Sequence, residues 1–185
     1  MFDYNQIDDQ ANTLTVSPLQ EQVHKLKEQL DNIESGTVVD IVAHSQGCVV
    51  VALAKPTNVR QIICLAPPDN VDVDRLINFF GSREGSEIDL NGQSRIPRRD
   101  GSTTIIPAAY WQSLKRLDVI RLYNRLPDLS QVKFYIADND EVLGTSNFDK
   151  TNKRIELVQL SGSHDFTGEA REHLVKLMRD NLVNS

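Results

Sequence analysis

The stretch that decides the fold is Asp40-Ile41-Val42-Ala43-His44-Ser45-Gln46-Gly47-Cys48. Apolar residues 38–42 predict a strand, and apolar residues 48–54 predict a helix directly after the turn. A serine on a sharp turn between a strand and a helix is a nucleophile elbow. Such a turn excludes large side chains two residues to either side of the serine, and Ala43 and Gly47 are both small. The pattern therefore predicts that Ser45 projects from the turn as a nucleophile.

The helix that follows the serine predicts an oxyanion-binding group. The backbone N–H of Gln46 lies at the start of this helix, where backbone donors and the helix dipole favour negative charge. His44 precedes the serine within the turn and does not easily face its hydroxyl group, so we count it with Gln46 as an oxyanion or substrate-binding candidate.

Two later segments supply the partners that a serine nucleophile needs. A serine requires a base to take its proton and a third group to orient that base. The predicted strand 132–137 ends in Asp138-Asn139-Asp140-Glu141-Val142, and the predicted strand 155–160 ends in Ser161-Gly162-Ser163-His164. The elbow, the acidic loop and the histidine loop each follow a strand.

These three motifs, in this order, resemble those of the α/β-hydrolase superfamily, in which the acid follows the serine and the histidine comes last. The resemblance runs from the elbow to the C-terminal helix. It implies a triad of Ser45, Asp140 and His164. Asp138 is the alternative acid; the family acid is usually followed after one or two residues by a β-branched residue, which favours Asp140.

The alternation of strands and helices predicts an α/β fold with a mostly parallel sheet and helices on both faces. We expect a single domain over residues 1–185, reduced at its N-terminus. Residues 69–126 exceed what one crossover requires, which predicts a small cap insertion with a helix near 72–80 and a hairpin at 94–106. The resemblance places such a cap over the site. Its aromatic residues are then either pocket candidates or the cap's own core (Tyr110, Trp111, Phe79 and Phe80).

The family pattern has an earlier strand whose loop gives a second oxyanion donor, and we find no such loop. Phe2-Asp3-Tyr4 is typical of the end of the strand before the first helix. Three explanations stay open: a misplaced or truncated start, a donor from another loop such as Asn5–Asn12, or a weak enzyme. Losing one donor costs about 3–4 kcal/mol of transition-state stabilisation. The sheet edge left uncovered also favours a homodimer.

Composition limits the remaining classes. The 185 residues are 39% hydrophobic and 25% charged, as in ordinary globular domains. A net charge of −6 argues against a general nucleic-acid binder. There is no apolar run long enough to span a membrane and no signal-peptide pattern, so we expect a cytoplasmic protein. The two cysteines, Cys48 and Cys64, predict neither a disulfide framework nor a zinc site.

The interpretation is a serine esterase that acts on a small-molecule ester or lactone through an acyl-enzyme, with no metal and no organic cofactor. Two other classes stay open. One is an acyltransferase or thioesterase with the same triad, and the other is a non-catalytic binding module on a hydrolase scaffold.

Overall fold

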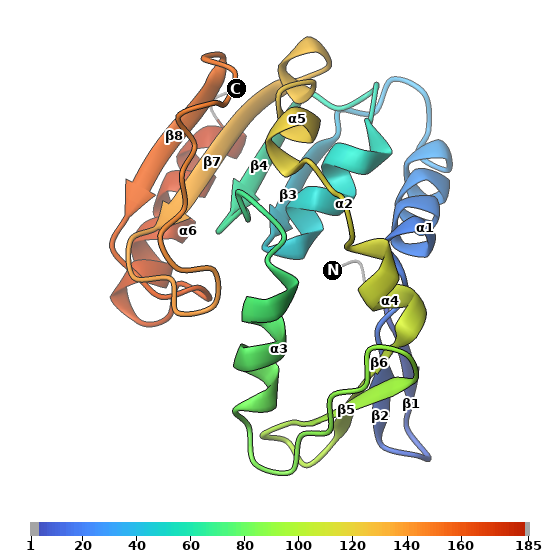
Figure 1. Cartoon of the computed structure of the whole chain (residues 1–185). Helices are drawn as coiled ribbons and strands as arrows, with labels where there is room; N and C mark the ends of the chain where they lie inside the picture. The colour runs from blue at the N-terminus through green and yellow to red at the C-terminus, as the bar shows by residue number, and fades with distance from the viewer. Residues whose placement is uncertain (1–3, 184–185) are drawn as a thin grey trace. The chain divides into compact units, whose positions relative to one another are not determined.

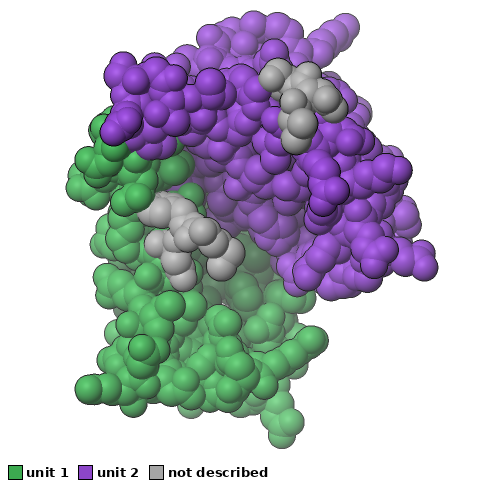
Figure 2. Space-filling model, turned by 180° about the vertical axis from the view of Figure 1, so that it is seen from behind, with its two compact units in different colours: residues 1–32, 71–117 green, residues 33–70, 118–185 purple. Residues whose placement is uncertain are grey.

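The computed structural model describes residues 4–183, which form two compact units (Figures 1 and 2). Unit 1 comprises the described residues up to Asn32 together with Val71–Leu117. Unit 2 comprises Ile33–Asn70 and the described residues from Asp118 onward. Each unit has its own four-stranded sheet.

The sheet of unit 2 is entirely parallel, in the order β3-β4-β7-β8. Its strands are rich in β-branched and aromatic residues, which suit a sheet that is covered on both faces. The strands are β3 (Asp40–His44), β4 (Gln61–Leu65), β7 (Gln131–Ala137) and β8 (Ile155–Leu160). All four carboxyl ends lie at one edge of the sheet, where open α/β sheets bind their ligands.

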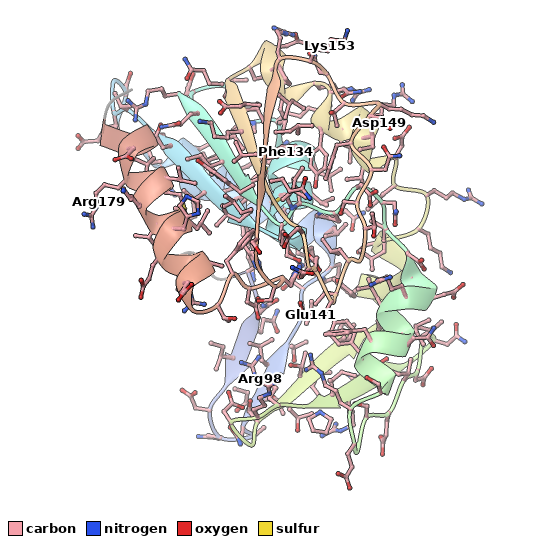
Figure 3. The ribbon with its side chains drawn as sticks, turned by 90° about the vertical axis from the view of Figure 1, so that its left-hand side faces the viewer. Arg98, Phe134, Glu141, Asp149, Lys153 and Arg179 are labelled. Atoms are coloured by element: carbon pink, nitrogen blue, oxygen red, sulfur yellow. The ribbon has the colours of Figure 1, made fainter. Side chains whose placement is uncertain are left out.

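Helices cover both faces of this parallel sheet (Figure 1). On one face, α5 (Val119–Tyr123) contacts α2 (Gln46–Ala54), and the ring of Tyr123 meets that of Phe134 in β7 edge to face, with ring centroids 4.9 Å apart. Figure 3 shows Phe134 at the middle of its strand. The next residue, Tyr135, points to the opposite face and packs with Leu174 of α6 (Glu169–Val183). Burial on both sides holds the strand ends in a fixed position.

The elbow strand β3 lies at the edge of this sheet. Among the described strands it pairs with β4 alone, and Val42 remains 42% exposed. An ion pair between Asp40 of β3 and Arg60, just before β4, closes the amino end of the pair. Hydrogen bonds from Arg60 hold the pKa of Asp40 below its usual value, against the opposing effect of burial. β3 is thus an edge strand of the sheet of unit 2, and the homodimer stays a prediction.

Unit 1 is built on a mixed sheet in the order β1-β2-β6-β5. The hairpin of β5 and β6 is antiparallel, whereas β2 and β6 are parallel. Trp111 and Tyr110 of α4 are buried, and α1 contacts α4. The elements are β1 (Gln6–Asp8), β2 (Thr13–Thr15), α1 (Leu19–Asp31), α3 (Val73–Gly81), β5 (Gln93–Pro97), β6 (Thr103–Pro107) and α4 (Ala108–Ser113).

The α/β class is confirmed, and the details differ from the expectation. Two sheets replace the single mostly parallel sheet, because the predicted hairpin pairs with β2 and not within the parallel set. Asn5–Asn12, considered as a loop, contains β1 and the turn of an antiparallel hairpin. Phe2 and Asp3, interpreted as a strand end, lie outside the described residues. The cap at 69–126 stays a prediction.

The helix α3 follows its sequence signal closely. Asp72 caps it by accepting a hydrogen bond from the backbone N–H of Arg75, at 2.9 Å.

The described part of the chain contains no helix with both the length and the apolar character that crossing a bilayer requires.

Candidate active site

The elbow holds Ser45 in an unusual backbone conformation between β3 and α2. Its φ of 52° and ψ of −124° lie in a region that non-glycine residues rarely adopt. Its backbone N–H donates to the carbonyl of Leu65 at 2.8 Å, which ties the turn to β4. Local strain of this kind persists only where the surrounding structure imposes it, and it clusters at functional sites. Gln46 is the first residue of α2, so its N–H lies at the positive end of the helix dipole.

The turn is less crowded at Gly47 than the sequence suggested. A Cβ atom placed there would lie 3.8 Å from the Cβ of Ala43, which is an ordinary van der Waals contact. Gly47 also has no positive φ. An alanine therefore fits this position, and the small-residue requirement is looser than expected on the helix side of the serine.

His164 connects the serine to an acid through two hydrogen bonds. Its Nδ1 lies 2.7 Å from Oδ2 of Asp140, and its Nε2 lies 2.9 Å from Oγ of Ser45. A carboxylate only accepts, so Nδ1–H of His164 donates to Asp140. In the neutral imidazole this leaves Nε2 as the acceptor for the Ser45 hydroxyl. The structure thus brings together the three residues at the ends of β3, β7 and β8.

Asp138, the alternative acid, has a different position. Its Oδ1 accepts hydrogen bonds from the backbone N–H of Gly162 at 2.9 Å and from the amide of Asn139 at 2.7 Å. These bonds join the loop after β7 to the loop after β8. Asp138 therefore shapes the loops, and Asp140 is the carboxylate that reaches His164.

Asp140 is buried yet remains ionised. Burial alone raises the pKa of its carboxyl group. Hydrogen bonds from His164 and from the backbone N–H groups of Leu143 and Val142 oppose this and hold the pKa below its usual 3.8. Because the pKa is lowered on folding, this carboxylate stabilises the fold above about pH 4. That contribution is lost as the pH falls through the lowered pKa.

Three further groups surround His164. Nε2–H of His44 donates to the backbone carbonyl of His164 at 2.9 Å, and the two rings are 4.9 Å apart. The carboxylate of Glu141, in the loop beyond β7 (Figure 3), accepts from the backbone N–H of His164 at 3.1 Å. Oδ1 of Asp165 lies 3.9 Å from Nε2 of His44. One ring nitrogen of each histidine and one oxygen of Asp165 lie within 4.8 Å of one another, so this cluster can hold a metal ion.

The chain is similar to several solved structures, although its sequence matches no known family. No protein-family model and no curated protein matches the sequence. Among solved structures, the esterase domain of a Rhodothermus marinus protein matches with a TM-score of 0.57 and 14% identity, over 80% of this chain and 60% of that domain. A Paleococcus ferrophilus monoacylglycerol lipase matches with a TM-score of 0.60 and 13% identity, over 91% and 76%.

A third match is a peroxisomal alpha-beta-hydrolase from Saccharomyces cerevisiae, with a TM-score of 0.54 and 11% identity, over 90% of this chain and 60% of that one. The chain has the α/β-hydrolase fold. The likeness that the three sequence motifs suggested is confirmed at this level. The chain spans only about 60% of the length of the Rhodothermus domain and of the yeast protein.

The four aromatic pocket candidates all lie in unit 1, and Trp111 and Tyr110 are the two that are buried. Trp111 is 1% exposed, and its Nε1–H donates to Oγ of Ser94 at 3.1 Å. Tyr110 is also buried, and burial raises the pKa of its hydroxyl group above the usual 10. Packing within unit 1 accounts for both residues as core, and their role in substrate binding stays a prediction.

The contacts that His44 and Glu141 make with the backbone of His164 were not predicted from the sequence. Each joins residues more than 20 positions apart, and no local pattern encodes such a pairing. The available signal was topological. Loops that follow the parallel strands of one sheet lie at the same edge, so polar residues at those strand ends are candidates for mutual contact.

Proposed function

We propose that this chain is a serine hydrolase that cleaves carboxylic ester or lactone bonds. The observation that carries the proposal is the continuous hydrogen-bond chain from Ser45 through His164 to Asp140. Each member has the neighbour that its role requires: a nucleophile beside a base, and a base beside an ionised acid that fixes its tautomer.

The first half of the reaction forms an acyl-enzyme. Ser45 Oγ attacks the carbonyl carbon while its proton moves to Nε2 of His164. Asp140 stabilises the imidazolium and holds Nδ1–H in place. The backbone N–H of Gln46, at the N-terminus of α2, faces the negative charge that develops on the carbonyl oxygen. The C–O bond then breaks, and His164 passes its proton to the leaving alcohol.

The second half repeats these steps with water. His164 takes a proton from water, the resulting hydroxide adds to the acyl carbon, and the proton returns to Ser45 as the acid departs. An acyltransferase or thioesterase would use the same residues with a different acceptor or leaving group. The names of the solved structures, an esterase domain and a monoacylglycerol lipase, support ester chemistry for this arrangement.

The test is hydrolysis of p-nitrophenyl esters of increasing acyl length by the purified chain and by Ser45→Ala. Removing a triad nucleophile typically costs about 10⁴–10⁶ in turnover. We expect Ser45→Ala to lose activity on that scale while it stays folded by circular dichroism. Ser163→Ala is the matched control, because Ser163 lies beside His164 in sequence and its Oγ lies 3.3 Å from Oγ1 of Thr167, outside the triad.

Either of two results would contradict the proposal. One is equal turnover by Ser45→Ala and the unchanged chain. The other is the absence of turnover for every ester and lactone offered, which would favour a binding module on a hydrolase scaffold.

A further inference from the structure

Two side chains that can bind a metal, His44 and Asp165, lie beside His164. The proposed reaction uses His164 but neither of these two. Their nearest ligand atoms, Nε2 of His44 and Oδ1 of Asp165, are 3.9 Å apart. A ring nitrogen of His164 lies within 4.8 Å of both. Nδ1 of His164 is engaged by Asp140, so the nitrogen that His164 can offer is Nε2, the atom that faces Ser45.

The Asp140–His164 pair prepares this nitrogen for a metal as well as for a proton. A histidine that ligates a metal through one nitrogen almost always donates its other N–H to a carboxylate or carbonyl, which fixes the ring and raises the basicity of the ligating atom. His164 has this arrangement, with Nδ1–H donating to Asp140 at 2.7 Å. The same hydrogen bond that makes His164 a base therefore makes it a good ligand.

The other two ligands can close around an ion. Zinc binds nitrogen at about 2.0–2.1 Å and carboxylate oxygen at about 2.0–2.2 Å, so tetrahedral ligand atoms lie roughly 3.3 Å apart. The two atoms that are 3.9 Å apart must approach by roughly 0.6 Å on that basis, and a pair at the 4.8 Å limit by roughly 1.5 Å. The side chains of His44 and Asp165 are 41% and 67% exposed and have room to turn, whereas His164 is buried and held.

We propose that His44, Asp165 and Nε2 of His164 form a binding site for a borderline-soft divalent ion such as Zn²⁺, with water as the fourth ligand, and that the bound ion switches off the triad. On binding, His44 gives up its hydrogen bond to the carbonyl of His164. Its proton moves from Nε2 to Nδ1 by way of solvent, so the ring stays neutral. The ion takes the lone pair of His164 that would otherwise accept the Ser45 proton. The inhibition rests on the proposed function, and the binding does not.

The ligand set also determines selectivity. Two imidazoles and one carboxylate suit Zn²⁺, Cu²⁺ and Ni²⁺. Ca²⁺ and Mg²⁺ require more oxygen ligands than this cluster supplies. Calcium at the same concentration is therefore the control ion.

The experiment is calorimetric titration of the tag-free chain with ZnCl₂ and, separately, with CaCl₂. The variants are His44→Gln, Asp165→Asn and Ser45→Ala. His24→Gln is the matched control, because His24 is an exposed histidine of α1 that pairs with Glu28. We expect one zinc site in the chain, in Ser45→Ala and in His24→Gln, and no calcium binding. His44→Gln and Asp165→Asn should each weaken zinc binding at least about tenfold, since even outer-shell partners contribute 10–100-fold.

Ester turnover measured over the same zinc concentrations completes the test. Inhibition that follows occupancy in the unchanged chain, and shifts to higher zinc in His44→Gln, supports the switch. Equal zinc affinity in His44→Gln and the unchanged chain, or no binding at all, overturns the site. Full turnover at saturating zinc overturns the switch. Zinc binding by Ser45→Ala as expected, together with no turnover by any form, keeps the site and contradicts the proposed function instead.

Discussion

The two units bury polar side chains of different kinds. In unit 2 the buried polar side chains of the described residues include two ionisable ones, Asp140 and His164. In unit 1 they are all neutral: Ser17, Gln22 and Ser94. Burying an ionisable group costs several kcal/mol unless partners compensate it, so such groups concentrate where chemistry needs them. The difference supports the proposal that unit 2 carries the chemistry, whereas the buried polar groups of unit 1 serve structural hydrogen bonding.

The largest expected effect comes from replacing each of the two acids in the loop after β7 by asparagine in turn. Asp140→Asn removes the charge that fixes the tautomer of His164, and loss of a triad acid in this way costs about 10⁴ in turnover. Asp138→Asn leaves an oxygen able to accept from the N–H of Gly162. We expect that variant to stay within about tenfold of the unchanged chain, a small fraction of a triad effect. Steady-state hydrolysis of one p-nitrophenyl ester by both variants measures the ratio.

The opposite order of the two losses in turnover would contradict the comparison between the units. If Asp138→Asn lost more turnover than Asp140→Asn, the buried carboxylate of unit 2 would be structural. Thermal unfolding of both variants at neutral pH is the control that separates loss of fold from loss of chemistry.

The aromatic core of unit 1 offers the complementary test. Trp111 is buried and its indole N–H is bonded to Ser94, so Trp111→Ala should cost about 3–5 kcal/mol of unfolding free energy. We expect the remaining folded protein to keep its acyl-length preference. Denaturant unfolding gives the first quantity, and turnover across an ester series gives the second.

Phe79 is the matched aromatic residue for this measurement. It is only half-buried on α3, and its ring lies under the guanidinium of Arg83 at 5.3 Å, so Phe79→Ala should cost less. A changed acyl-length preference in Trp111→Phe, with stability retained, would instead make Trp111 a pocket residue. Unit 1 would then contribute to specificity.

Local sequence predicted the strand ends of unit 2 because the information there is local. A hydrophobic strand, a tight turn and a small residue are adjacent in the chain, and the acid and histidine loops each follow their own strand. The β-branched Val142, two positions after Asp140, is a local signal that already favours Asp140 over Asp138. The contacts themselves depend on tertiary structure: Asp138 accepts from Gly162, and Asp140 accepts from His164.

Unit 1 was harder to predict because its pairing is non-local. β1 and β2 have three residues each, too short for an alternating pattern, and β2 gains stability from pairing with β6, about 90 positions later in the sequence. The proposed zinc site has no local signal for the same reason. The sequence offered a metal site only through its two cysteines, whereas His44, at the end of β3, and Asp165, in the loop after β8, come close only in the folded sheet.

The smallest expected effect sharpens the comparison at the elbow itself. A Cβ at Gly47 meets only an ordinary contact, and alanine is favoured over glycine inside a helix by up to about 1 kcal/mol. Gly47→Ala should therefore leave stability unchanged or raise it slightly, with turnover close to that of the unchanged chain. Gly162→Ala is the contrast, because its Cβ would lie 2.9 Å from that of Ala170 and should cost about 1–3 kcal/mol by overpacking. Thermal unfolding ranks the two, and ester turnover accompanies it. If Gly47→Ala lost turnover without losing stability, the turn of unit 2 would need that space for the reacting group, and its small residue would serve the chemistry more than the fold.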